Sequence, residues 1–86
     1  MPRVSEFFGI VIAMYFNDHA PPHFHARYAE HEALIGIETL EVIGGELPRR
    51  ALALVLEWAV LQRTALREDW QRARAGESLR PIPPLE

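Results

Sequence analysis

The feature that most constrains the fold is a long stretch without helix breakers in the second half of the chain. No glycine or proline occurs between Arg49 and Ala75, whereas Pro48 precedes this stretch and Gly76 follows it. Proline is favoured in the first turn of a helix, where its missing N–H costs nothing, and glycine is favoured just after the last turn. We therefore predict helical structure throughout this stretch.

The character of this helical stretch changes along its length. From Ala51 to Leu61 the only charged residue is Glu57, so this half is apolar on all sides and should be buried on more than one side. Farther along, the pattern becomes amphipathic, but Arg63 interrupts the apolar stripe. We expect a bend or the start of a second helix near Thr64, and hence a long bent helix or a helical hairpin.

The first half of the chain contains short segments rich in branched and aromatic residues, separated by turn residues, which is typical of antiparallel strands. The predicted strands are 9–16, 23–28, 32–38 and a short strand or extended end at 41–43 that Gly44-Gly45 terminates. Both faces of the first strand are apolar, so it should lie in the middle of the sheet or meet a partner chain.

The second of these strands alternates polar and apolar side chains, as a strand with one solvent-facing side does. Phe24 and Ala26 are expected to face the core. His23, His25 and Arg27 are expected to face outward on the same side of the strand. The polar residues of this strand are therefore candidates for a surface site.

Together these elements predict an α+β fold: a three- to four-stranded antiparallel sheet followed by a long bent helix or helical hairpin packed on one face. We expect a single domain over residues 1–80 and an extended tail over residues 81–86, which contain three prolines. The first strand and the helix carry more apolar surface than one small sheet covers, so we also expect a homodimer.

The composition limits the class of protein. There is no cysteine, which excludes disulfides, thiolate metal sites and a cysteine nucleophile. The formal net charge of −3 does not indicate non-specific nucleic-acid binding, although all nine basic residues are arginine, which suits phosphate and carboxylate groups. The N-terminal residues do not resemble a secretion signal, and the longest apolar run is too short to span a bilayer. We expect a cytoplasmic protein without a membrane partner.

Three of the four histidines lie between Asp18 and Ala26, around a Pro-Pro pair. On one strand face His23 and His25 would be about 6–7 Å apart, a separation at which both imidazoles can bind one ion. His19 or Asp18 would supply a third ligand across the turn. The first site hypothesis is a centre for a divalent metal such as zinc, formed by Asp18, His19, His23 and His25, with an open position for a catalytic water.

Two other hypotheses fit the same residues. In a metal-free site, one histidine acts as general base and the other as general acid, while an arginine holds a phosphate. His23, His25 and Arg27 would then form an RNase-like catalytic centre. In a purely structural turn, Asp18 caps the turn and the imidazoles hydrogen-bond backbone groups beside the prolines. The sequence leaves all three hypotheses open.

The box Asp-His-x-Pro-Pro-His-Phe-His at residues 18–25 is similar to that of a family of small bacterial proteins known as domain of unknown function 4160. The segments 47–52 and 57–59 and the later Trp70 also resemble this family, so the resemblance covers nearly the whole chain. It implies an interaction or regulatory module of a two-gene, toxin–antitoxin-like system. It also implies a small partner protein encoded by a neighbouring gene.

Overall fold

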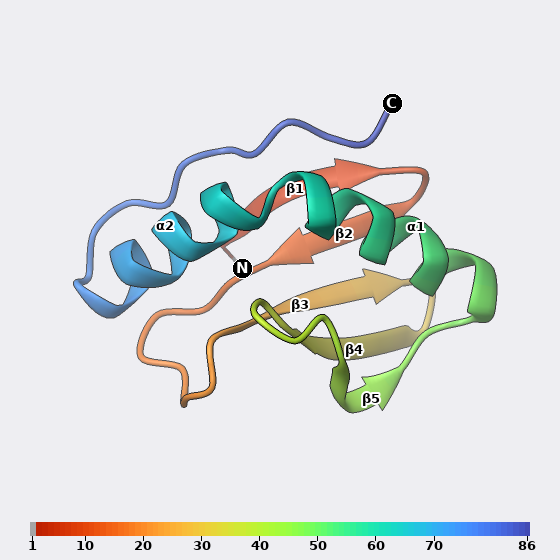
Figure 1. The fold of residues 1–86 in the computed structure, drawn as a ribbon, viewed down its shortest axis with the longest axis horizontal. Helices are drawn as coiled ribbons and strands as arrows, with labels where there is room; N and C mark the ends of the chain where they lie inside the picture. Colours follow the sequence, from red (N-terminus) through yellow and green to blue (C-terminus); the bar gives the residue numbers. More distant parts are fainter. Residues whose placement is uncertain (1) are drawn as a thin grey trace.

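The computed structural model describes residues 2–86, which form an antiparallel sheet followed by two helices (Figure 1). The strands are β1 (Arg3–Phe7), β2 (Ile10–Ala13), β3 (His23–Tyr28), β4 (His31–Gly36) and β5 (Val42–Glu46), and the helices are α1 (Arg49–Leu61) and α2 (Arg63–Arg74). The order of the strands in the sheet is their order in the chain. The predicted α+β fold is therefore confirmed. Neither helix is both long and apolar enough to cross a bilayer.

The sheet has five strands, whereas the sequence predicts three or four. The additional strand is β1, whose alternation is disturbed by a bulge between Arg3 and Ser5. At the other edge, β5 continues through Gly44-Gly45, where the sequence predicts its end. Gly45 has a φ of 68° and passes so close to the carbonyl oxygen of Glu32 that a Cβ atom would overlap it. The glycines thus permit strand pairing here instead of ending it.

The core lies between the inner face of the sheet and the two helices. Ile12, Ala26 and Ala33 are register neighbours on β2, β3 and β4, and all three are fully buried. Trp58 of α1 packs against this face, with its ring centre 5.9 Å from that of Phe24 in an edge-to-face arrangement. In a chain this short, burial of such large aromatic side chains is a main contribution to stability.

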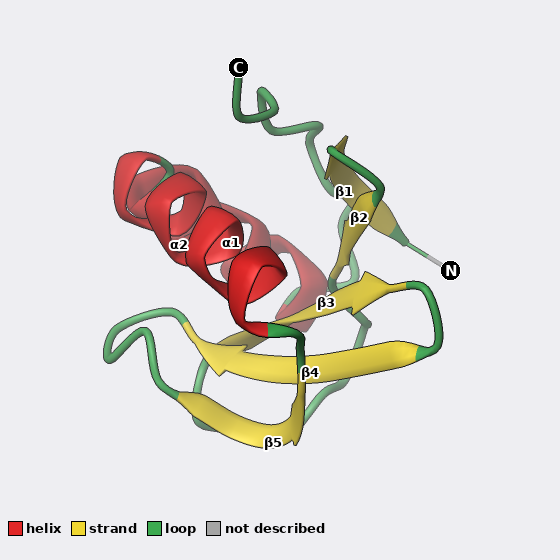
Figure 2. Cartoon of the chain, turned by 90° about the vertical axis from the view of Figure 1, so that its right-hand side faces the viewer, coloured by secondary structure: helices red, strands yellow, loops and turns green. Residues whose placement is uncertain are grey.

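A single residue, Gln62, separates α1 from α2, so the two form a bent helix rather than a hairpin. Figure 2 shows both helices on the same side of the sheet. Arg63, which interrupts the apolar stripe, donates a hydrogen bond from Nε to the carbonyl oxygen of Ile37 at 3.2 Å. One turn later, Arg67 forms two hydrogen bonds of 2.7 Å with Glu38. These contacts fix the first turns of α2 to the segment that follows β4.

The C-terminal tail packs onto the domain without forming a helix or strand. The N–H of Ile82 donates to the carbonyl oxygen of Val4 at 2.8 Å, so the tail lies along the outer edge of β1 (Figure 1). The indole N–H of Trp58 donates to the carbonyl oxygen of Pro83 at 2.8 Å. The Ile82 side chain is only 4% exposed and belongs to the core. The tail therefore covers a sheet edge that would otherwise be unpaired.

Helix α2 holds the segment just before this tail through a buried acid, Asp69. Its Oδ1 accepts a hydrogen bond of 2.9 Å from the backbone N–H of Arg80. Burial raises the pKa of the Asp69 carboxyl, although the Arg80 N–H and the charge of Arg72 act in the opposite direction. Asp69 thus joins α2 to the segment before the tail, although its burial disfavours the charged form of the carboxyl group.

Ile82→Ala should lower the free energy of unfolding by about 2–4 kcal/mol, because truncating a buried isoleucine removes contacts and leaves a cavity. Urea denaturation followed by tryptophan fluorescence measures the change. Glu86→Ala, at an exposed position of the same tail, is the control and should change the value by less than about 0.5 kcal/mol. Equal effects of the two substitutions would mean that the tail does not belong to the core.

Candidate metal centre

The histidine box lies at the start of β3. The apolar run 9–16 belongs to the sheet only as far as Ala13, and the chain then leaves the sheet in a loop that returns at His23. Within this loop Asn17 has a φ of 61°, a left-handed conformation that asparagine tolerates better than most residues. The turn brings the carboxylate of Asp18 next to the first residues of β3.

Three side-chain atoms converge at this point. Nε2 of His23 and Nε2 of His25 each lie 3.1 Å from Oδ2 of Asp18. All three atoms lie within 4.8 Å of one another. Two imidazole nitrogens and one carboxylate oxygen form a ligand set that is common for divalent transition metals. The geometry therefore allows these residues to hold one such ion.

Both imidazoles are oriented through their second ring nitrogen. Nδ1 of His23 lies 2.8 Å from the carbonyl oxygen of Pro21. Nδ1 of His25 lies 3.1 Å from Oε2 of Glu32. A carbonyl oxygen can only accept, so Nδ1 of His23 carries the proton, and the neutral ring has a lone pair on Nε2. Metal-binding histidines are commonly held in this way, by a hydrogen bond from the nitrogen that does not bind the metal.

His23 is buried, which corrects the expectation that it faces solvent. Its exposed fraction is 4%. The reason is that α2 reaches the start of β3, where the ring centre of Trp70 lies 5.3 Å from that of His23. Among the residues that the structure describes, Nε2 of His23 has no hydrogen-bond partner. A buried polar atom without a partner is uncommon and requires a physical explanation.

The other two members of the group are more accessible than His23. The side chains of His25 and Asp18 are 15% and 23% exposed. Tyr15 packs edge-to-face on the His25 ring, with ring centres 4.6 Å apart. The group is therefore closed on the side of His23 and partly open on the side of His25 and Asp18.

The local contacts favour the charged form of Asp18. Its Oδ1 accepts a hydrogen bond of 3.0 Å from the backbone N–H of His19, which leaves Oδ2 for the imidazoles. Partial burial raises the pKa of Asp18, but hydrogen bonds from His25 and the His19 N–H, together with the positive charge that the two neighbouring imidazoles carry when protonated, lower it below the ordinary value. An ionised carboxylate is the form that binds a cation.

Some of the predicted site residues lie close together in the structure, and others do not. The converging residues are Asp18, His23 and His25. The imidazole of His19 is exposed and lies outside this group, and only its backbone N–H contacts Asp18. Arg27, predicted for metal-free catalysis, is exposed, and its guanidinium lies 3.9 Å from the carboxylate of Glu32.

Two residues that shape the site, Glu32 and Trp70, are missing from the sequence-based prediction. The tight turn between β3 and β4 sets a register in which Glu32 lies on the outer face, diagonal to His25. That signal could have identified Glu32. The contact between Trp70 and the histidine box depends on how far α2 extends along the sheet, which no local pattern encodes.

A family model described as Domain of unknown function (DUF4160) matches residues 9–71 of the chain. The matched segment extends from the start of β2 into α2 and includes all three converging residues. No curated protein and no solved structure matches the chain.

The ring of His23 should be the Nδ1–H tautomer, because Nδ1 donates to a carbonyl oxygen. Long-range ¹H–¹⁵N correlation spectra of the metal-free protein distinguish the two tautomers of an imidazole ring. The exposed imidazole of His19 is the internal reference. A spectrum that shows the Nε2–H tautomer for His23 would contradict the orientation described here.

Proposed function

The chain belongs to the family of the domain of unknown function DUF4160, and we propose that it binds one divalent transition-metal ion through Asp18, His23 and His25. One observation carries the proposal. Nε2 of His23 is buried, lacks a hydrogen-bond partner among the described residues and faces the carboxylate of Asp18 at 3.1 Å.

This contact is unfavourable without a cation. The Nδ1 proton of His23 is directed at Pro21, so a neutral ring presents a lone pair to Oδ2 of Asp18, and both atoms are acceptors. A second proton on His23 would remove the repulsion, but it would place a charge on an almost fully buried ring. A divalent cation accepts the lone pairs of both residues at once, and the carboxylate offsets part of its charge.

Two of the three separations between the ligand atoms, those from Oδ2 of Asp18 to each Nε2, suit a small cation. With metal–ligand bonds of about 2.0–2.1 Å, neighbouring ligand atoms of a tetrahedral or octahedral site lie roughly 2.9–3.4 Å apart. Both Nε2–Oδ2 distances, at 3.1 Å, fall within this range. Three protein ligands leave a coordination position open, where a metal can activate a water molecule. Hydrolysis is therefore the reaction class to test first.

The protein should bind one equivalent of zinc, measured by isothermal titration calorimetry and by plasma mass spectrometry of protein purified without chelator. Glu32→Gln, which acts through the orientation of His25, should weaken binding roughly 10–100-fold. Asp18→Asn and His25→Ala, which remove ligand atoms, should weaken it further. Bound zinc should also raise the melting temperature of the wild-type protein, because it binds the folded state.

His19→Ala is the matched control, because His19 belongs to the same sequence box but its imidazole lies outside the converging group. This variant should bind zinc like the wild-type protein. Circular dichroism checks that all variants fold. The proposed metal centre would be wrong if the wild-type protein does not bind zinc. It would also be wrong if the His19→Ala variant loses zinc binding while the His25→Ala variant keeps it.

The metal-free RNase-like alternative requires that His23 be accessible to a substrate. As a general acid or base, this residue would have to exchange protons with an RNA substrate, yet its side chain is only 5% exposed. RNA cleavage that persists in EDTA and is lost in both His25→Ala and Arg27→Ala would favour this alternative over the metal centre.

A second role is that of an interaction or regulatory module in a two-gene, toxin–antitoxin-like system, as the family resemblance suggests. We propose it because α1 leaves apolar surface uncovered. Val60 and Leu61, at its end, are 59% and 68% exposed, and Leu52 and Leu56 are only half-buried. Adjacent exposed apolar side chains often mark interaction surfaces. The simplest partner for this surface is a second copy of the chain, which gives a homodimer.

Light scattering coupled to size-exclusion chromatography should give the mass of two chains for the wild-type protein. Leu61→Glu should give the mass of one chain, because an unpaired carboxylate is unfavourable within an apolar contact. Gln71→Glu, at an exposed position of α2, introduces the same charge elsewhere and should leave the dimer intact. A monomeric wild-type protein would contradict the homodimer.

A further inference from the structure

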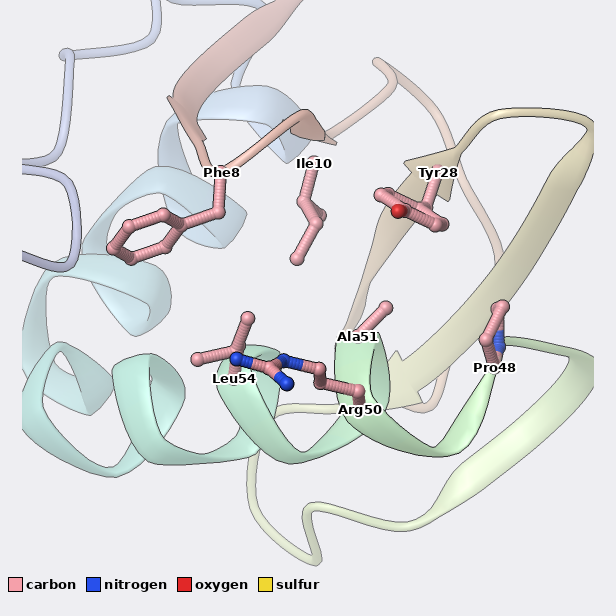
Figure 3. A pocket seen from close by; sticks show the side chains of 7 residues that line it. All are labelled: Phe8, Ile10, Tyr28, Pro48, Arg50, Ala51 and Leu54. Carbon is pink, nitrogen blue, oxygen red and sulfur yellow. The ribbon is translucent and has the colours of Figure 1, made fainter.

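An apolar pocket of about 320 Å³ lies at the end of β3 that is farther from the metal ligands (Figure 3). Ile10 and Tyr28 project into it from the sheet, and Arg50 and Leu54 face them from α1. Phe8, in the turn between β1 and β2, forms one side of its mouth. This volume is at the lower end of the range for ligand pockets, so it suits one large side chain or a similarly small group.

The backbone conformation of Phe8 is unusual for an aromatic residue. Phe8 and Gly9 form the two-residue turn between β1 and β2, with φ values of 50° and 79°. Such turns strongly favour asparagine or aspartate followed by glycine, and positive φ is costly for a bulky residue. The ring is also 60% exposed. The chain thus tolerates backbone strain in order to keep an exposed aromatic ring at the mouth of the pocket, which is typical of functional positions.

The charge around the pocket is positive. Among the described residues that line it, Arg50 is the only charged one. The arginines that form ion pairs within residues 2–86 are Arg3, Arg27, Arg67 and Arg72, and Arg50 is not among them. The first turn of α1 contains no acidic residue. A carboxylate at the mouth of the pocket would therefore meet an arginine that has no acidic partner among residues 2–86.

We propose that this pocket binds a segment of a partner protein in which a large apolar side chain is flanked by acidic residues. The apolar side chain enters between Ile10 and Leu54, the Phe8 ring covers it, and a neighbouring carboxylate pairs with Arg50. The inference rests on the interaction role proposed above and does not depend on the metal centre.

The test uses the full chain labelled with ¹⁵N and a short synthetic peptide that contains one phenylalanine flanked by aspartates. Saturable shifts of the amide signals of Tyr28, Ala51 and Leu54 are expected. The same peptide with lysines in place of the aspartates should bind at least about tenfold more weakly, because it lacks the charge pair. Arg50→Gln should weaken binding of the aspartate peptide by about the same factor. Arg49→Gln, at an exposed residue outside the pocket lining, should not.

Phe8→Asn is the most informative variant. It creates the favoured Asn-Gly turn, so the protein should be at least as stable as the wild type, yet it should lose most of its peptide binding. This separates the role of the ring in binding from any role in folding, because thermal unfolding reports the fold independently.

Three outcomes would overturn the proposal: no saturable shifts, equal affinity for the two peptides, or unchanged binding by Phe8→Asn. Shifts at the same amides that depend only on the concentration of the protein itself would mean that a second copy of the chain occupies the pocket. This outcome would also overturn the proposal. The oligomeric state is measured separately by light scattering, so the pocket and the homodimer can fail independently.

Discussion

The hydrogen bond from Nδ1 of His23 to the carbonyl oxygen of Pro21 decides the chemistry of the candidate site. Because the carbonyl group can only accept, this bond fixes the position of the ring proton and leaves Nε2 as an acceptor. Trp70 then separates this acceptor from solvent, and Asp18 places a second acceptor 3.1 Å away. A proton or a cation between these two acceptors removes their repulsion, and a divalent cation is the occupant that we propose.

The fold supplies each part of that arrangement from a different region of the chain. β3 is paired on both sides, so the positions of His23 and His25 are fixed by the sheet. α2 is fixed by the two hydrogen bonds between Arg67 and Glu38, which helps to keep Trp70 over the histidine box. A small domain buries a limited part of its surface, and an ion that binds only the folded state would add to its stability. A metal would thus strengthen the structure that forms its site.

The sequence predicts the helical part of the fold well because its signals are local. Pro48 and Gly76 bound the helical segment, and Gly76 has a φ of 74° just after α2, as expected for a residue that ends a helix. The break at Gln62 is next to Arg63, which interrupts the apolar stripe. The sequence analysis does not predict strand β1 or the continuation of β5 through its glycines. Both depend on bulges and on a close backbone approach, which alternation alone does not reveal.

The site is predicted less completely because it depends on contacts between distant residues. The spacing of His23 and His25 on one strand is local, and it correctly suggests that the two side chains share a face. Whether Asp18 or the His19 imidazole joins them depends on the conformation of the loop, and the structure selects Asp18. The burial of His23 requires Trp70, which lies far along the chain, so the solvent exposure inferred for His23 from alternation is wrong.

A zinc titration followed through the imidazole ¹⁵N resonances is the sharpest test of the proposed metal centre, because it reports each histidine separately. If Asp18, His23 and His25 hold the ion, the Nε2 resonances of His23 and His25 should shift together and reach saturation at one equivalent of zinc, while those of His19 and His31 do not change. Saturation that shifts His19, or the absence of any shift at His23, would contradict the metal centre formed by Asp18, His23 and His25.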